Sequence, residues 1–134
     1  MADIEFFDRN WGKTVDSQDG SPCVRVQITF EQDDRSITEY GLIDTGSNLT
    51  MVHQQAVLGL SPDYQSTSDI ANGPMPTPIY KATICIVGET TPTPIFVGVI
   101  KDGRLKILLG RDFLKPFIML YDQRHQLFTL NLST

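Results

Sequence analysis

The feature that most constrains the fold is a series of short segments in which apolar and polar residues alternate. Within residues 23–30, for example, Val24, Val26 and Ile28 fall on one side of an extended chain and polar residues fall on the other. A period of two residues is typical of a half-buried β-strand. Turn residues separate the expected strands, which are Cys23–Phe30, Ser36–Ile43, Ile79–Val87, Ile95–Ile100, Leu105–Leu109, Phe117–Tyr121 and Gln126–Leu132. The pattern predicts an all-β, barrel-like sheet.

Helical character is confined to two short segments, His53–Leu60 and Arg111–Lys115. Six of the eight prolines lie between Pro62 and Pro94. Because proline cannot donate to a strand ladder, regular structure in that stretch is expected to be short or on sheet edges. Residues 1–21 show little periodicity, so we expect an N-terminal arm over 1–21, or in part an edge strand through Ile4, Phe6 and Phe7, and one domain over 22–134.

Length and charge narrow the function classes. The 134 residues, 40% hydrophobic, suit one globular domain. With 11 Lys and Arg against 16 Asp and Glu, the formal net charge is −5. An acidic chain without a basic cluster is a poor ligand for nucleic acid or for anionic membranes. The apolar runs are also far shorter than the roughly 18–20 residues that span a bilayer. We therefore expect neither nucleic acid nor membrane as a partner.

Cysteine and histidine usage points to a metal-independent protein in a reducing compartment. The two cysteines make no disulfide framework, and the N-terminal residues show no signal-peptide pattern. A cytoplasmic location is expected, or a place as a soluble domain of a longer precursor. His53 and His125 are far apart and have no ligand cluster around them, so no metal and no cofactor are expected.

Asp44-Thr45-Gly46-Ser47 is the first candidate for chemistry. It follows the apolar end of one expected strand and precedes a second apolar segment, which places a carboxylate on a rigid element near the interior. Thr45 supplies a hydroxyl, and Gly46 lets backbone N–H groups approach the acid. For the triplet alone, a solvated hairpin turn is the alternative.

A second segment near the C-terminal end has a related character. In Ile107–Leu114, an apolar strand through Leu109 meets Gly110, and a short helical turn begins at Arg111. By itself this is also the pattern of a core strand that ends in a glycine turn.

Together the two segments resemble the retropepsin-type aspartic peptidases, most of all the single-domain retroviral-like proteases of bacteria and retroelements. The likeness rests on Leu42–Ser47 and on Leu108–Asp112, and it extends from about Val24 to Leu130. It implies a small closed β-barrel and a homodimer in which each copy supplies one catalytic Asp. It also implies cleavage of extended polypeptides with apolar residues beside the scissile bond, under a mobile flap.

The resemblance assigns roles within the first motif. Asp44 is the general acid and base acting on a water held between the two copies. Thr45 corresponds to the residue whose hydroxyl links the two active loops near the dimer axis. Gly46 gives backbone access to acid and substrate, and Ser47 supports the loop.

In the second motif, Leu109 backs the active loop and Gly110 lets the strand lie close behind it. Arg111 corresponds to a structural arginine that braces the loop and the dimer contacts. Asn48 is a departure, because retroviral relatives often have an Asp there that pairs with this arginine.

The segment Ser68–Tyr80 stands where the family has its flap, with Asn72-Gly73 as a favourable turn dipeptide. Ile70, Ala71, Asn72 and Gly73 are the candidate flap and substrate-binding residues. The prolines that follow make this segment stiffer than the family's often Gly-rich flaps.

The chain has one Asp-Thr-Gly motif, so the proposed mechanism requires a dimer. Hydrolysis by carboxylates needs two acids that share a proton, and this chain has a single Asp-Thr-Gly, at Asp44. The second Asp44 must come from a symmetric partner. Two alternatives keep the fold without turnover: a peptide-binding module, and a structural oligomerisation domain.

Overall fold

The computed structural model describes residues 2–8, 10–14, 20–70, 73–101, 103, 105–122, 124–125 and 127–132; residues 66–70 and 73–76 are described by their backbone. In chain order the elements are β1 (Ile4–Phe7), β2 (Lys13–Thr14), β3 (Ser21–Phe30), β4 (Ser36–Ile43), β5 (Met51–His53), the 3-10 helix η1 (Gln54–Val57), β6 (Tyr64–Ile70), β7 (Gly73–Ile86), β8 (Thr93–Ile100), β9 (Ile107–Leu109), α1 (Arg111–Leu114), β10 (Phe117–Asp122) and β11 (Leu127–Leu132).

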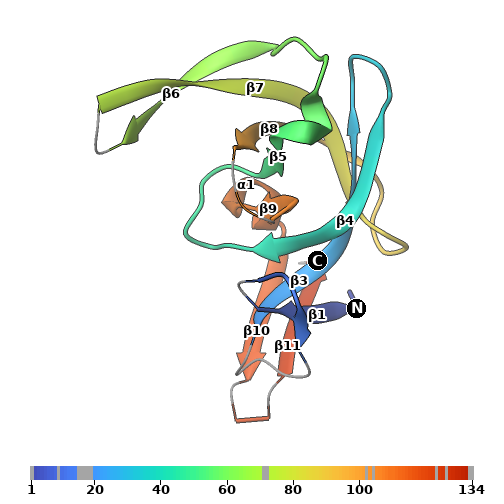
Figure 1. Ribbon diagram of the computed structural model, residues 1–134. Coiled ribbons are helices and arrows are strands. Elements are labelled where there is room, and N and C mark those ends of the chain that lie inside the picture. The colour runs from blue at the N-terminus through green and yellow to red at the C-terminus, as the bar shows by residue number, and fades with distance from the viewer. Residues whose placement is uncertain are drawn as a thin grey trace.

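Within the described part of the chain, six strands close into a barrel in the order β3-β4-β9-β5-β8-β7, and β7 pairs back onto β3 (Figure 1). β4–β9 and β5–β8 are parallel pairs, and the other pairs around the barrel are antiparallel. The expected all-β barrel with one or two short helices is therefore confirmed.

The alternation in β3 fills the barrel. Val24, Val26, Ile28 and Phe30 are at most 1% exposed, as their spacing predicts. They pack in one cluster with Ile107 and other buried apolar side chains from the remaining barrel strands and α1. Burial of each such side chain contributes about 1.5–3 kcal/mol, so the alternating pattern is the main source of the fold's stability.

The prolines of β7 all face one edge of the strand. Asp63 N donates to Ile79 O at 2.8 Å, so the backbone groups of Ile79 face β6. Residues two apart in a strand present their backbone groups to the same side, so Pro74, Pro76 and Pro78 face away from β6. The ladder from Tyr64–Ile79 to Ile70–Gly73 therefore keeps its donors. The edge placement expected for prolines holds here, but the strand is long, because alternate spacing removes donors from a single side.

Other boundaries differ from expectation. The segment expected as a helix over His53–Leu60 begins as strand β5 and becomes η1 only over Gln54–Val57. β5 is three residues long, too short for any periodicity to show in the sequence, and its pairing with β8 and β9 defines it.

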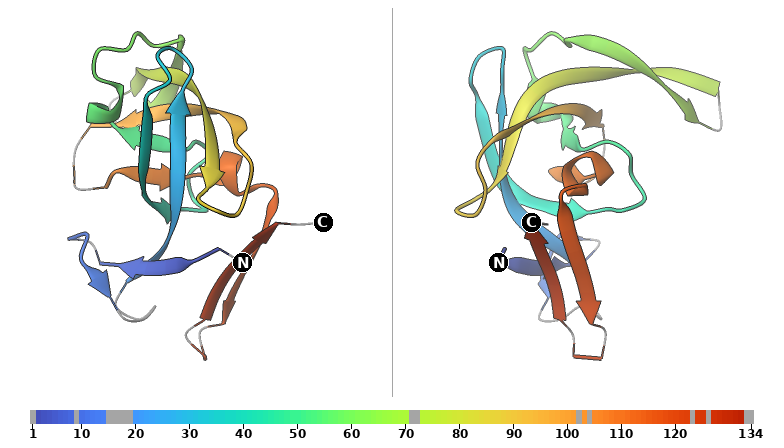
Figure 2. Two further views of the ribbon diagram at one scale, coloured as in Figure 1. Left: turned by 90° about the vertical axis from the view of Figure 1, so that its right-hand side faces the viewer. Right: turned by 180° about the vertical axis from the view of Figure 1, so that it is seen from behind.

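The two ends of the chain add pieces outside the barrel. β1 pairs with β2 on one edge and with β3 on the other. β10 and β11 form a separate hairpin that projects from the barrel at the end opposite to the β6–β7 hairpin (Figure 2). The division of the chain at residue 21 stays a prediction.

Candidate active site

Asp44 is the first residue after β4, and backbone contacts fix it there. Its N–H donates to Leu109 O in β9 at 2.9 Å, and its carbonyl accepts from Ser47 N at 3.2 Å. Gly46 N donates to Asp44 Oδ1 at 2.9 Å, which closes a side-chain turn of the kind that Asp commonly makes. The residue is half-buried. A carboxylate is thus held at the tip of a barrel strand and remains accessible to solvent.

The loop after Asp44 is fastened to the second motif. Arg111 N donates to Ser47 O at 2.8 Å, and Ser47 Oγ donates to Leu49 O at 2.8 Å. Thr45 and Arg111 are exposed, whereas Leu109 is fully buried. The two segments identified in the sequence, about 60 residues apart, therefore meet behind the candidate catalytic acid.

The backbone around position 110 leaves room only for glycine. Its φ of −90° is accessible to any residue, but a Cβ built there would lie 2.6 Å from Leu49 C and 2.7 Å from Leu49 O. Real Cβ atoms do not approach backbone that closely, so any side chain would push the active loop away from β9. The close packing expected at Gly110 is what the backbone geometry requires.

Thr50 and Asp112 complete the support, and neither was assigned a role from the sequence. Thr50 is fully buried; its Oγ1 accepts from Gly110 N at 3.1 Å and donates to Asp112 Oδ1 at 2.7 Å. Thr50 N also lies 3.0 and 3.1 Å from the two carboxylate oxygens of Asp112. Phe113 N donates to Asp112 Oδ1 at 2.8 Å, which fixes this acid in the first turn of α1. The sequence feature that could have identified Asp112 is its place two residues after Gly110.

The candidate flap is a hairpin of β6 and β7, with Ile70 and Gly73 as the last paired residues. Ala71 and Asn72 lie outside the described residues. Figures 1 and 2 place this hairpin and the loop between β4 and β5 on the same side of the barrel. The substrate-binding role of the four residues stays a prediction.

The C-terminal hairpin exposes an apolar face. Ile118 and Leu120 in β10 are 59% and 57% exposed, and Leu127 in β11 is 48% exposed. The register pairs Ile118 with Asn131, Leu120 with Thr129 and Asp122 with Leu127. Paired residues point to the same side, so the three apolar side chains share one face of the two-stranded sheet with Asp122, Thr129 and Asn131. Exposed apolar residues grouped on one face are typical of a surface that meets another protein.

Two further findings concern the described residues only. They contain no group of three or more His, Cys, Asp or Glu side chains arranged to hold a metal ion. No helix among them is long and apolar enough to cross a membrane.

Comparisons with known proteins bear on the fold. No protein-family model and no curated protein matches this sequence. A retropepsin-like aspartic protease from Rickettsia conorii is similar in structure, with a TM-score of 0.63 and 20% identity over 98% of this chain and 91% of that one. The simian foamy virus protease is similar with a TM-score of 0.52 and 15% identity, over 69% of this chain and 91% of its own. The chain therefore has a retropepsin-like fold.

Proposed function

We propose that this protein is a homodimeric aspartic endopeptidase in which Asp44 of each copy forms the catalytic pair. The observation that carries the proposal is the placement of one carboxylate, half-buried, at the tip of β4 and fixed through Gly46 and Leu109. The retropepsin-like fold supports it, since the two motifs that suggested the chemistry meet at this point.

The chemistry follows from bringing two such acids together. Two carboxylates about 3 Å apart repel by roughly 5 kcal/mol at an effective dielectric near 20, so one stays protonated while the other ionises. The ionised Asp44 takes a proton from a water, the water attacks the peptide carbonyl, and the protonated Asp44 donates to the carbonyl oxygen. The shared proton belongs to the pair; aspartic proteases are the general example of this behaviour.

A second copy is needed because the chain has one Asp-Thr-Gly. The apolar face of Ile118, Leu120 and Leu127 supports a second copy as partner. β1 is the weaker candidate, because β3 covers one of its edges along its whole length and β2 covers the other edge at Phe6 and Phe7. The hairpin β10–β11 is therefore the terminal element that we expect to contribute to the dimer.

The substrate class is an extended polypeptide, with the β6–β7 hairpin as its cover. Cys23 and Cys85 are both free thiols, which supports a reducing, cytoplasmic setting. A peptide-binding or oligomerisation module of the same fold, without turnover, is the competing proposal, favoured by the three prolines in β7.

Incubation with a mixed peptide library between acidic and neutral pH, read by mass spectrometry, tests the proposal. Cleavage by the parent protein and none by Asp44→Asn supports the peptidase. Binding of peptides without cleavage by either protein supports the module. Equal cleavage by both would mean that Asp44 is not the catalytic acid.

A further inference from the structure

The β6–β7 hairpin stands out from the barrel and is joined to it by two legs (Figure 1). One leg is the segment 58–63 that leads into β6. The other is the part of β7 around Ile79 and Lys81. The orientation of the hairpin relative to the Asp44 loop depends on how these legs are held.

The β7 leg is bound both to the barrel and to the β6 leg. Glu31 N, in the turn between β3 and β4, donates to Lys81 O at 3.1 Å. Lys81 N donates to Asp63 Oδ2 at 2.8 Å, and Asp63 N donates to Ile79 O at 2.8 Å. The β7 leg is thus a continuation of the barrel, and the two Asp63 contacts fasten the last residue of the β6 leg to it.

The β6 leg has one apolar anchor, Leu60, which is half-buried and packs against the core cluster. Leu58 is 65% exposed, and Ser61, Pro62 and Asp63 are all exposed. Burial of apolar surface, which fixes the barrel strands, therefore acts on this leg mainly at Leu60. Beyond Leu60, where the residues are exposed, polar contacts decide where this leg lies.

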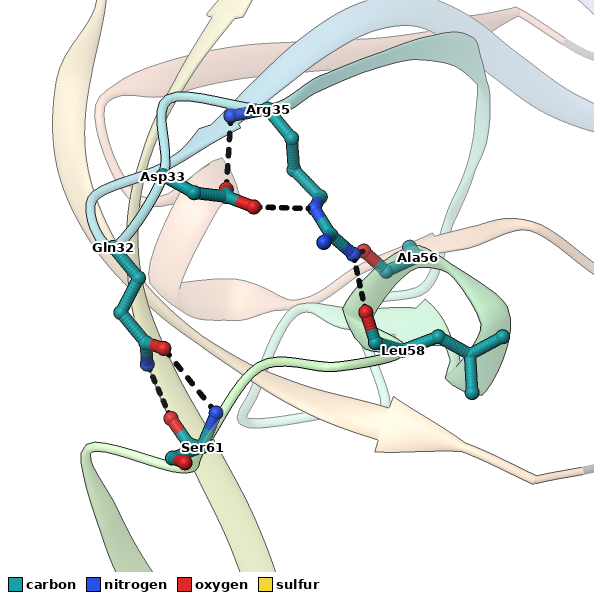
Figure 3. A network of polar contacts seen from close by, with 6 residues as sticks. All are labelled: Gln32, Asp33, Arg35, Ala56, Leu58 and Ser61. Atoms are coloured by element: carbon teal, nitrogen blue, oxygen red, sulfur yellow. Dashed lines mark hydrogen bonds and ion pairs between the residues drawn. The ribbon is translucent and has the colours of Figure 1, made fainter.

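Gln32 supplies a pair of such contacts (Figure 3). Ser61 N donates to Gln32 Oε1 at 3.2 Å, and Gln32 Nε2 donates to Ser61 O. The side-chain amide satisfies both backbone groups of Ser61, as a neighbouring strand would. Gln32 lies in the same turn as Glu31, so one turn touches both legs.

Arg35 extends the contact along the same leg (Figure 3). Its N and Nε donate to the carboxylate of Asp33 at 3.1 and 3.0 Å, which orients the guanidinium. Its Nη1 then donates to Leu58 O at 2.6 Å and Ala56 O at 3.4 Å, at the end of η1. Carbonyls at a helix end lack partners within the helix, so Arg35 satisfies groups that otherwise need water.

We propose that Gln32, supported by Arg35, is a positioning residue that sets the orientation of the β6–β7 hairpin over the candidate active site. Its contact with Ser61 keeps the β6 leg against the barrel, so that the hairpin is held in place before substrate arrives. The kinetic consequence rests on the proposed peptidase function; the structural one does not.

The test compares Gln32→Ala and Gln32→Glu with Ser36→Ala. The Ser36 hydroxyl bonds Thr29 Oγ1 at 2.7 Å in the same hairpin without touching either leg, which makes it the matched control. The Gln32→Glu change keeps an acceptor for Ser61 N but loses the donor to Ser61 O, so its effect should be intermediate. Hydrogen exchange read by mass spectrometry measures local opening in the whole chain.

Gln32→Ala should speed exchange of the β6 amides by roughly tenfold, while β3 and β9 stay within about twofold of the parent. Ser36→Ala should leave β6 unchanged. On a cleaved peptide, KM should rise roughly five- to tenfold with kcat within about twofold, because only substrate binding is weakened.

Unchanged β6 exchange, or equal acceleration in every strand, would overturn the proposal. So would faster β6 exchange with unchanged KM. If the parent protein cleaves no peptide, the peptidase proposal fails, and the exchange measurement still decides whether Gln32 holds the hairpin.

Discussion

Thr50 and Asp112 are 62 residues apart in sequence, and their side chains meet at 2.7 Å directly behind the Asp44 loop. The Thr50 hydroxyl also accepts from Gly110 N, so one buried group joins β9, α1 and the active loop. This contact joins the two sequence motifs, neither of which is specific by itself, into one site.

Thr50→Val should therefore weaken both stability and catalysis. Valine has nearly the same shape but leaves Gly110 N–H without its acceptor and removes a donor to Asp112, which costs about 2 kcal/mol. Urea unfolding checks the stability, and kcat on a cleaved peptide checks the site. Thr38→Val, at an exposed position on β4, is the control and should change neither. A parent-like Thr50→Val protein would show that this contact does not organise the loop.

Gly110→Ala should destabilise by about 3 kcal/mol, because the new methyl group meets the Leu49 backbone at 2.6 Å. Gly88→Ala is an informative comparison. Gly88 has φ of +78° and open space around it, so alanine there meets only torsional strain of about 1 kcal/mol. The urea midpoints of the two variants distinguish a steric clash at position 110 from backbone strain at position 88. Equal losses would contradict the tight packing described at Gly110.

Mixing the parent chain with Asp44→Asn should inhibit it, since each site is expected to need an Asp44 from both copies. With free exchange, an equimolar mixture leaves about a quarter of the dimers with two aspartates. Activity per parent chain should fall to about half as the mutant is titrated in to equality. Activity proportional to parent chain alone would mean that one subunit suffices.

Ile118→Asp should weaken the dimer without unfolding the monomer, because the side chain is 59% exposed in the single chain. A charge placed at the centre of an apolar interface should raise the dimer Kd by roughly 30-fold or more. Sedimentation at several concentrations measures it, with activity following the dimer fraction. Val87→Asp, 39% exposed in the turn after β7, is the control. A parent-like Kd for Ile118→Asp would place the interface elsewhere.

Stability should fall at alkaline pH through Cys23. Burial raises the pKa of this thiol to about 12. The unfolded thiol ionises near pH 9.0, so between these values the folded state holds a proton that the unfolded state loses, and stability declines as pH rises. The Cys23 contribution to this decline is about 2 kcal/mol between roughly pH 8 and 10.5. In Cys23→Ala, the free energy of unfolding should fall by about 2 kcal/mol less than in the parent over this pH range. Parallel slopes would contradict the assignment.

Sequence periodicity was sufficient for the barrel strands that bury one face, because each carries its own pattern, as β3 does. It failed at β5, which is defined by its neighbours, and at Gln54–Val57, where a single turn of helix replaced a longer expected one. Asp44 and Gly110 could be selected from local motifs. Thr50 could not, because its importance comes from a contact made across the fold with Asp112. The roles of Thr45, Arg111 and the residues at the hairpin tip stay predictions, since they depend on a second copy or a bound peptide.

The prolines of β7 have a consequence for behaviour at high concentration. A long exposed strand edge normally offers a row of N–H donors on which another chain can add a strand and begin a fibril. Along the outer edge of this projecting hairpin, Pro74, Pro76 and Pro78 remove those donors one after another. The β7 edge of the projecting arm is therefore closed to strand addition, and a neighbouring molecule could add a strand only on the opposite edge, that of β6.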